Sequence, residues 1–144
     1  SGHVPSDRLL HRVDGQDAER RRHARLQADL RDAGALPDLV EQAVAHFGRL
    51  DALVNNASSY YATPIGTATP QQWDDLFASN ARAPFFLSQA AAPHLAFHGG
   101  AIVNLVDVHA ERPRADLSAY ASSKAALLAL TRNLALHWVD DGIR

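Results

Sequence analysis

The chain has 144 residues, of which 47% are hydrophobic and 21% charged, a composition typical of one soluble domain with a substantial core. A formal net charge of −2 gives no electrostatic reason to expect nucleic acid or an anionic membrane as a partner, and no apolar run is long enough to span a bilayer. The absence of cysteine excludes disulfides and thiolate metal sites and favours the cytoplasm as the location.

The two ends of the sequence indicate that the chain belongs to a longer one. No methionine occurs, so Ser1 is not expected to be a translation start, and the arginine-rich opening lacks the apolar core of a signal peptide. At the other end, Gly142 follows a helical pattern, where a helix would end and lead into a further element. We therefore expect one domain over residues 1–144 that is incomplete at both ends.

Segments with the periodicity of strands and of helices alternate along the chain. The predicted elements, in chain order, are a strand at 24–30, a helix at 36–47, a strand near 50–58, a helix at 70–96, a strand near 99–108 and a helix at 117–139. This alternation predicts a parallel sheet with helices on both faces, the doubly wound α/β class with a Rossmann-like domain.

Local signals refine three of these helices. Gly48 is expected to end the first, while Thr69 and Gln72 have the spacing of a capping box at the start of the second, which we expect to bend at Pro84. The inner face of the last helix is predicted to comprise Leu127, Leu130, Thr131, Leu134 and Trp138.

Polar residues that follow strands are the candidates for a site, because ligands bind at the carboxyl edge of such sheets. Asp107 follows the third strand, and Tyr120 and Lys124 are spaced to lie on one face of the last helix. Lys124 is the only lysine in the chain. Its ammonium would favour the phenolate of Tyr120 and so lower the pKa of this residue, which would make it a proton donor and acceptor near neutral pH.

This combination, with "NNA" after the second strand and Asn80 within the long helix, resembles the short-chain dehydrogenase/reductase family. The resemblance runs from about residue 29 to the end of the chain. It implies that Tyr120 is the proton donor as hydride arrives, that Lys124 holds the nicotinamide ribose, and that Asn80 anchors a water relay. It also implies contacts to NADPH (NADP) from Asp29, Leu30, Asn56, Ala57, Ser58, Tyr120 and Lys124.

Two departures from the usual family pattern resemble its pteridine reductase branch. The chain reads "NNASSYY" where most members read "NNAG", and Asp107 occupies the usual serine position, thirteen residues before Tyr120. By this resemblance, Tyr60 would stack on a flat pterin substrate such as dihydrobiopterin or dihydrofolate, and Ser58 would contact both cofactor and pterin. Asp107 would accept from the pterin edge or assist in proton delivery.

The glycine-rich turn that receives a dinucleotide pyrophosphate does not occur in the sequence, and in the family it precedes the segment that carries Asp29. Two alternatives to a pterin reductase therefore stay open. One is a related reductase of carbonyl substrates, and the other is a non-catalytic fragment or scaffold. In either case the helices near 70–96 and 117–139 are expected to contact another subunit in a homo-oligomer, a dimer or tetramer, and no metal site is expected.

Overall fold

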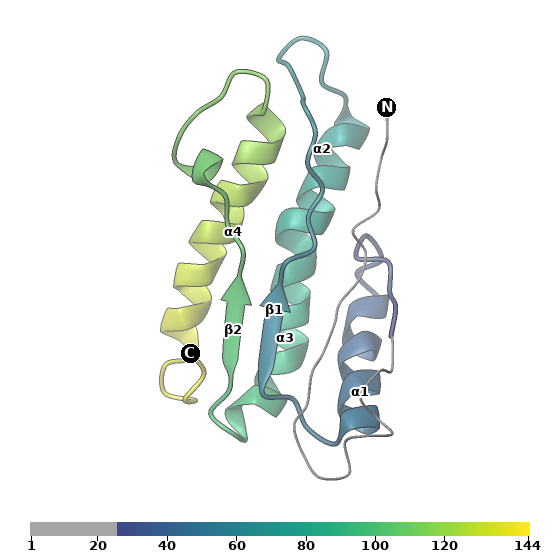
Figure 1. The fold of residues 1–144 in the computed structure, drawn as a ribbon, viewed down its shortest axis with the longest axis vertical. Helices are drawn as coiled ribbons and strands as arrows, with labels where there is room; N and C mark the ends of the chain where they lie inside the picture. Colours follow the sequence, from purple (N-terminus) through teal and green to yellow (C-terminus); the bar gives the residue numbers. More distant parts are fainter. Residues whose placement is uncertain (1–25) are drawn as a thin grey trace.

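The computed structural model describes residues 26–144, and Figure 1 shows them as a short parallel sheet backed by long helices. The elements are α1 (Ala35–Phe47), β1 (Ala52–Asn55), α2 (Pro70–Phe77), the π-helix η1 (Ala78–Arg82), α3 (Ala83–Ala96), β2 (Ala101–Asn104), the 3₁₀ helix η2 (Val108–Ala110) and α4 (Ser118–His137). Among these residues, no helix has the length and apolar character needed to cross a membrane.

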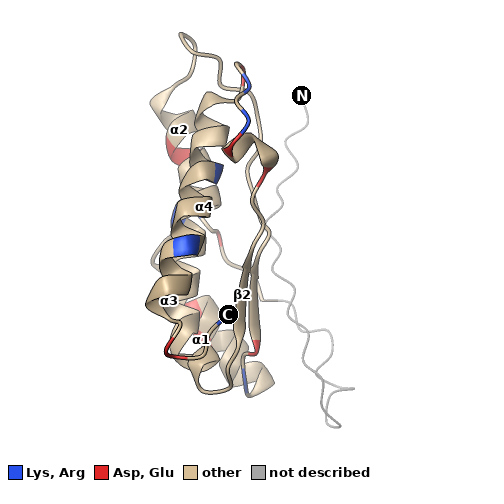
Figure 2. Ribbon diagram, turned by 90° about the vertical axis from the view of Figure 1, so that its left-hand side faces the viewer, with Lys and Arg blue, Asp and Glu red and all other residues tan. Residues whose placement is uncertain are grey.

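The sheet consists of β1 and β2, which are parallel and in register from Ala52 opposite Ala101 to Asn55 opposite Asn104. This confirms the predicted parallel α/β arrangement. Viewed along the sheet, the helices of the described residues lie on one of its faces (Figure 2). Val54 and Val103 point away from the helices and are 46% and 48% exposed.

The strand predicted at 24–30 is the main error of the sequence-based prediction. Residues 26–29 have no regular structure and residue 30 lies in a turn, while residues 24 and 25 fall outside the described part. A strand needs a hydrogen-bonded neighbour, and in the described residues the only sheet is the pair formed by β1 and β2. Leu30 still packs into the main core, at 7% exposure.

Helix α1 forms as predicted because its apolar residues recur at helical spacing. Leu36, Leu39, Val40 and Ala43 are buried against α3 and the sheet. Gly48 ends the helix with φ of 85° and donates its N–H to the carbonyl of Val44. This left-handed conformation is available to glycine at little cost, which explains why the helix ends there.

The long second helix is interrupted before the predicted bend. It begins as predicted, with the reciprocal hydrogen bonds of the Thr69 and Gln72 capping box. The chain then widens into η1, where the N–H of Ala83 reaches the carbonyl of Ala78, five residues back. Pro84 follows directly, and its ring would clash with a carbonyl four residues earlier, so the wider turn accommodates it. The irregularity therefore lies at 78–82, which includes Asn80.

Helix α4 is buried in its first half and half-exposed in its second. Of the predicted inner face, Leu127 is 2% exposed, whereas Leu130, Thr131, Leu134 and Trp138 are only partly buried. The first half packs on α2, where Leu76, Leu117, Ala119 and Tyr120 form a small second core. Tyr120 is consequently held in a rigid part of the molecule, next to the ends of the strands.

Candidate active site

The candidate site lies at the carboxyl edge of the sheet, where the loops after β1 and β2 meet the start of α4. The structure brings together the three groups on which the sequence-based hypothesis depends: the Asp107 carboxyl, the Tyr120 phenol and the Lys124 ammonium. Tyr120 and Lys124 project from adjacent turns of α4, and Asp107 comes from the loop that follows β2. Because parallel strands end on the same side of a sheet, the fold itself produces this convergence.

Asp107 and Tyr120 are joined by a direct hydrogen bond. The Tyr120 hydroxyl donates to Oδ2 of Asp107 at 2.9 Å, and Oδ1 of Asp107 accepts from the backbone N–H of His109 at 2.8 Å. The His109 N–H is the first cause of a lowered Asp107 pKa, which the hydrogen bond from Tyr120 and the charges of His109 and Lys124 reinforce. The carboxyl is therefore ionised at neutral pH, and its negative charge faces the phenol.

The pKa of Tyr120 departs from the expectation. Burial of the phenol is the first cause of a raised pKa, and the hydrogen bond and negative charge of Asp107 act in the same direction. The spacing along the chain predicted that Lys124 would lower this pKa, and that direction was wrong. A carboxylate in direct contact with the hydroxyl has the larger effect on the phenol.

Lys124 lies beneath the site and is 5% exposed. Its Nζ donates to the carbonyl of Leu105 at 2.9 Å, at the point where the chain leaves β2. Burial lowers its pKa, and the nearby negative charge of Asp107 acts in the opposite direction. The compact ammonium can donate in two further directions, whereas a planar guanidinium would not fit the same buried space.

Tyr60 lies against Tyr120 and remains open to solvent. The two rings meet edge to face, with centroids 4.8 Å apart at an interplanar angle of 89°, and Tyr60 is 57% exposed. Arg114, which is paired with Asp116 at 2.8 Å, interacts with Tyr60 from the loop before α4. Tyr60 thus lies exposed beside the phenol, and its predicted role in stacking on a substrate stays a prediction.

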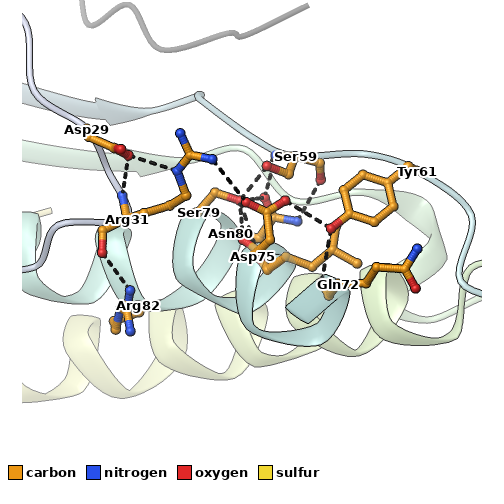
Figure 3. Close-up of polar contacts among 10 residues, drawn as sticks. Asp29, Arg31, Ser59, Tyr61, Gln72, Asp75, Ser79, Asn80 and Arg82 are labelled. Carbon is orange, nitrogen blue, oxygen red and sulfur yellow. Dashed lines mark hydrogen bonds and ion pairs between the residues drawn. The ribbon is translucent and has the colours of Figure 1, made fainter. Parts of the chain in front are cut away.

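Asn80 connects three parts of the site, as Figure 3 shows in part. Its Oδ1 accepts from the N–H of Ser59 at 2.9 Å and from the hydroxyls of Ser58 and Ser79 at 3.0 and 3.1 Å. Its Nδ2 donates to the carbonyl of Ser59 and to Oγ of Ser123, whose hydroxyl in turn donates to the carbonyl of Tyr120. These contacts use the side-chain amide, which holds the loop after β1 against α4. The water relay at Asn80 stays a prediction.

The residues predicted to bind the cofactor lie in two places, at Asp29 before α1 and directly after β1. Asn56 is exposed directly after β1, while Ala57 and Ser58 are half-buried. The carboxyl of Asp29 is bound by the N–H and Nε of Arg31 at 2.9 and 3.0 Å, and the bond from Nε is the first cause of its lowered pKa. Figure 3 shows that Arg31 also reaches Asp75 on α2, 3.6 Å away. A charged network therefore runs from Asp29 to the helix that contacts Tyr61.

Several polar residues outside the predicted set of site residues support the site. Asn55 and Asn104 end β1 and β2 side by side, and Nδ2 of Asn55 donates to Oδ1 of Asn104 at 2.7 Å. Asn104 in turn donates to Thr131 on α4 at 2.9 Å. Thr63, which is 1% exposed, accepts from the N–H of Ala119 in the first turn of α4. The asparagine that ends each strand was the available signal for the first pair.

The residues predicted to hold a nicotinamide dinucleotide carry suitable polar groups. Lys124 and the half-buried Ser58 have donors that can bind a ribose diol, and the carboxylate of Asp29 can accept from an adenine amine. These contacts to the cofactor stay predictions. The turn that would receive the pyrophosphate is not among the described residues. The described residues also contain no group of three or more side chains that could hold a metal ion.

A separate groove of about 650 Å³ lies between α3 and the second half of α4, away from the candidate site. Phe85, Leu130, Leu134 and Trp138 contribute to its apolar lining. These helices are the ones predicted from the sequence to contact another subunit. The contact itself stays a prediction.

Comparison with known proteins agrees with the fold. The family model described as short chain dehydrogenase matches residues 5–144. The 2-dehydro-3-deoxy-D-gluconate 5-dehydrogenase of Escherichia coli (strain K12) is 35% identical over 125 residues, which cover 85% of this chain and 49% of that protein.

Two solved structures extend this similarity. A variant of a Serratia marcescens short-chain dehydrogenase/reductase is 39% identical with a TM-score of 0.77, over 82% of this chain and 48% of that one. A blue fluorescent protein from a metagenomic library, in complex with NADPH, is 41% identical with a TM-score of 0.76, over 81% of this chain and 47% of that one. The chain thus spans about half the length of these proteins, none of which is named as a pteridine reductase.

Proposed function

Because this chain belongs to the short-chain dehydrogenase family, we propose that it carries the catalytic half of an NADPH-dependent oxidoreductase that reduces a carbonyl substrate. The observation that carries the proposal is the convergence of Tyr120, Lys124 and Asp107 at the carboxyl edge of the sheet. Such a cluster combines a proton donor with a fixed positive charge, which carbonyl reduction needs.

Each residue has a distinct task in this proposal. The bound cofactor supplies a hydride to the carbonyl carbon. Tyr120 donates its phenolic proton to the carbonyl oxygen, and the ammonium of Lys124, which the carbonyl of Leu105 fixes in place, binds the ribose and stabilises negative charge that develops nearby. Asn80 and Ser123 act as positioning residues, because they tie α4 at Tyr120 to the loop after β1.

Reduction of a pterin is the second candidate, and two specific features favour it. Asp107 offers a carboxylate to the donors along a pterin edge, and the exposed ring of Tyr60 offers a face for stacking. The relatives named above support carbonyl and alcohol chemistry instead, so we place the pterin second. The two candidates share the cofactor and the proton donor and differ only in the group that is reduced.

The direct test follows NADPH oxidation with purified protein and two substrate panels, dihydropterins and carbonyl compounds that include sugar acids. We expect turnover with carbonyl compounds that is abolished in Tyr120→Phe. Turnover with pterins alone, lost in Asp107→Ser, would select the second candidate. If neither panel is turned over and NADPH does not bind, the chain is a non-catalytic scaffold and the proposed function is wrong.

We also propose that the apolar groove between α3 and α4 contacts a second copy of the chain. Its position on two adjacent long helices and its lining of Phe85, Leu134 and Trp138 suit helix packing between subunits. Sedimentation of the parent and of Leu134→Glu measures the oligomeric state of each protein. A dimer or tetramer that dissociates in the variant supports the proposal, and an unchanged assembly contradicts it.

A further inference from the structure

The hydrogen bond between Tyr120 and Asp107 affects the pH range of the reaction. Reduction of a carbonyl needs Tyr120 as the neutral phenol, which gives up a proton, whereas oxidation of an alcohol needs the phenolate, which takes one. In this structure the phenolic hydrogen lies in a 2.9 Å bond to a carboxylate that also accepts from the N–H of His109. Loss of that hydrogen would leave two negative oxygens in contact.

The other charged and titratable groups around Tyr120 do not offset this effect at the hydroxyl. Tyr60 contacts the ring from the loop after β1, and Arg114 reaches Tyr60 but is paired with Asp116. His109 on η2 and Lys124 on α4 act electrostatically on Asp107, and the Lys124 ammonium donates to the carbonyl of Leu105. Asp107 is therefore the group in direct contact with the phenolic oxygen.

We propose that Asp107 is a positioning residue that acts through Tyr120: its carboxylate retains the phenolic proton and so extends reduction into alkaline solution. The inference rests on the proposed function and adds a pH range to it. Burial and the carboxylate both raise the pKa of Tyr120, in agreement with the geometry. The usual serine at this position carries no charge and would lack this effect.

The balance of hydride and proton in the reaction determines which kinetic properties Asp107 can change. Reduction takes one hydride from the reduced nicotinamide and one proton from Tyr120, which recovers its proton from solvent; oxidation reverses both transfers. At any given pH the ratio of the two catalytic efficiencies is set by the equilibrium of the reaction, so Asp107 cannot alter it. Asp107 instead sets the pH at which reduction begins to fall and oxidation reaches its plateau.

Asp107→Asn is the informative variant, because the amide oxygen can still accept from the N–H of His109 and keep the start of η2 in place. The first measurement is a titration of phenolate absorbance without cofactor, with Tyr120→Phe used to assign the Tyr120 signal by difference. We expect Tyr120 to ionise at lower pH in Asp107→Asn than in the parent. A tenfold rise in phenolate, at a pH below both midpoints, would mean that the pKa of Tyr120 has fallen by about one.

The second measurement is the pH profile of kcat/KM in both directions. We expect the alkaline limb of reduction and the plateau of oxidation to move to lower pH in Asp107→Asn by the same amount as the titration midpoint. The matched control is Asp75→Asn, which removes a carboxylate 2.9 Å from the hydroxyl of Tyr61, away from the site. This control should alter a phenol titration without moving either catalytic limb.

Four outcomes overturn the inference in distinguishable ways. Identical Tyr120 titration in the parent and Asp107→Asn would show that the carboxylate does not retain the proton. Complete loss of oxidation at every pH in Asp107→Asn would show that Asp107 is instead the terminal proton acceptor of a relay. If the parent has no turnover in either direction, the proposed function is wrong and the inference fails with it. If the parent turns over substrate but the limbs of the pH profile do not move in Asp107→Asn, only the inference is wrong.

Discussion

The molecule contains two tyrosines that each donate a hydrogen bond to an aspartate at 2.9 Å, and their surroundings differ. Tyr120 bonds to Asp107 at the end of β2, above a buried lysine. Tyr61 bonds to Asp75 on α2, and the cation beside that carboxylate is Arg31, at 3.6 Å (Figure 3). Burial and the carboxylate raise the pKa of Tyr61 to about 12 and also raise that of Tyr120.

The difference between the two pairs shows that a shared hydrogen-bond geometry does not define a catalytic group. The Tyr61 hydroxyl also donates to the carbonyl of Gln72, so it joins a loop to a helix. Tyr120 is distinguished by its place at the sheet edge, by the exposed ring of Tyr60 against it, and by the buried ammonium of Lys124 one turn along the same helix. Matched substitutions at the two pairs can therefore separate their roles.

Removal of the Tyr120 and Tyr61 hydroxyls should give the largest difference in turnover between the two pairs. We expect Tyr120→Phe to reduce turnover by about 100-fold or more, because general acid catalysis contributes about 10²–10⁴. Tyr61→Phe removes an equivalent hydroxyl and should leave turnover close to that of the parent. Steady-state NADPH oxidation measures both variants, and equal losses in the two would contradict the assignment of the proton donor.

Lys124→Met should impair both stability and cofactor affinity, since it leaves the carbonyl of Leu105 without its donor. A hydrogen bond from a charged donor contributes about 1.5–3 kcal/mol, and urea unfolding would detect its loss. We also expect weaker NADPH binding in titrations of the folded variant. Arg31→Met, which removes the cation beside Asp75, is the control at the other pair and should cost less because that site is exposed.

Asn80→Ala should destabilise the protein and disturb the Tyr120 pair more than the Tyr61 pair. The change leaves the Ser59 N–H and the Ser123 hydroxyl without their amide partner, at a cost of about 1–3 kcal/mol. Ser79→Ala, which removes a neighbour on the same π-helix, should cost less. Urea unfolding ranks the two variants, and equal stability of Asn80→Ala and the parent would contradict the role of Asn80 as a connection.

The smallest effect should come from alkaline titration of the Tyr61 pair. Because the folded-state pKa of Tyr61 lies above the ordinary value of about 10, its contribution to stability is complete below pH 10 and is lost as the pH rises to about 12. Asp75→Asn should reduce this loss only partly, since burial is the first cause. Thermal unfolding between about pH 9 and 12 would measure it, and an identical loss in both proteins would exclude a contribution from Asp75.

The local elements could be predicted from the sequence better than their tertiary partners. Helix α1 and the capping box at Thr69 were predicted because each depends on residues close together in the chain. The parallel pair of strands was predicted from the alternation of strand and helix patterns. Residues 26–30 do not form the strand predicted at 24–30, because a strand depends on a neighbour that no local pattern supplies. The one-sided helical layer is a second tertiary property of the described residues (Figure 2).

The amino-acid sequence by itself determined which groups face the site: the spacing of Tyr120 and Lys124 places them on one helical face, and alternating periodicity brings strand ends to one edge. Only the tertiary structure decided how they interact. It turned Lys124 toward the carbonyl of Leu105, directed the Tyr120 hydroxyl at Asp107 and engaged the whole amide of Asn80. The reason is that a pKa depends on burial and on charges contacted across the fold, which spacing along a chain does not specify.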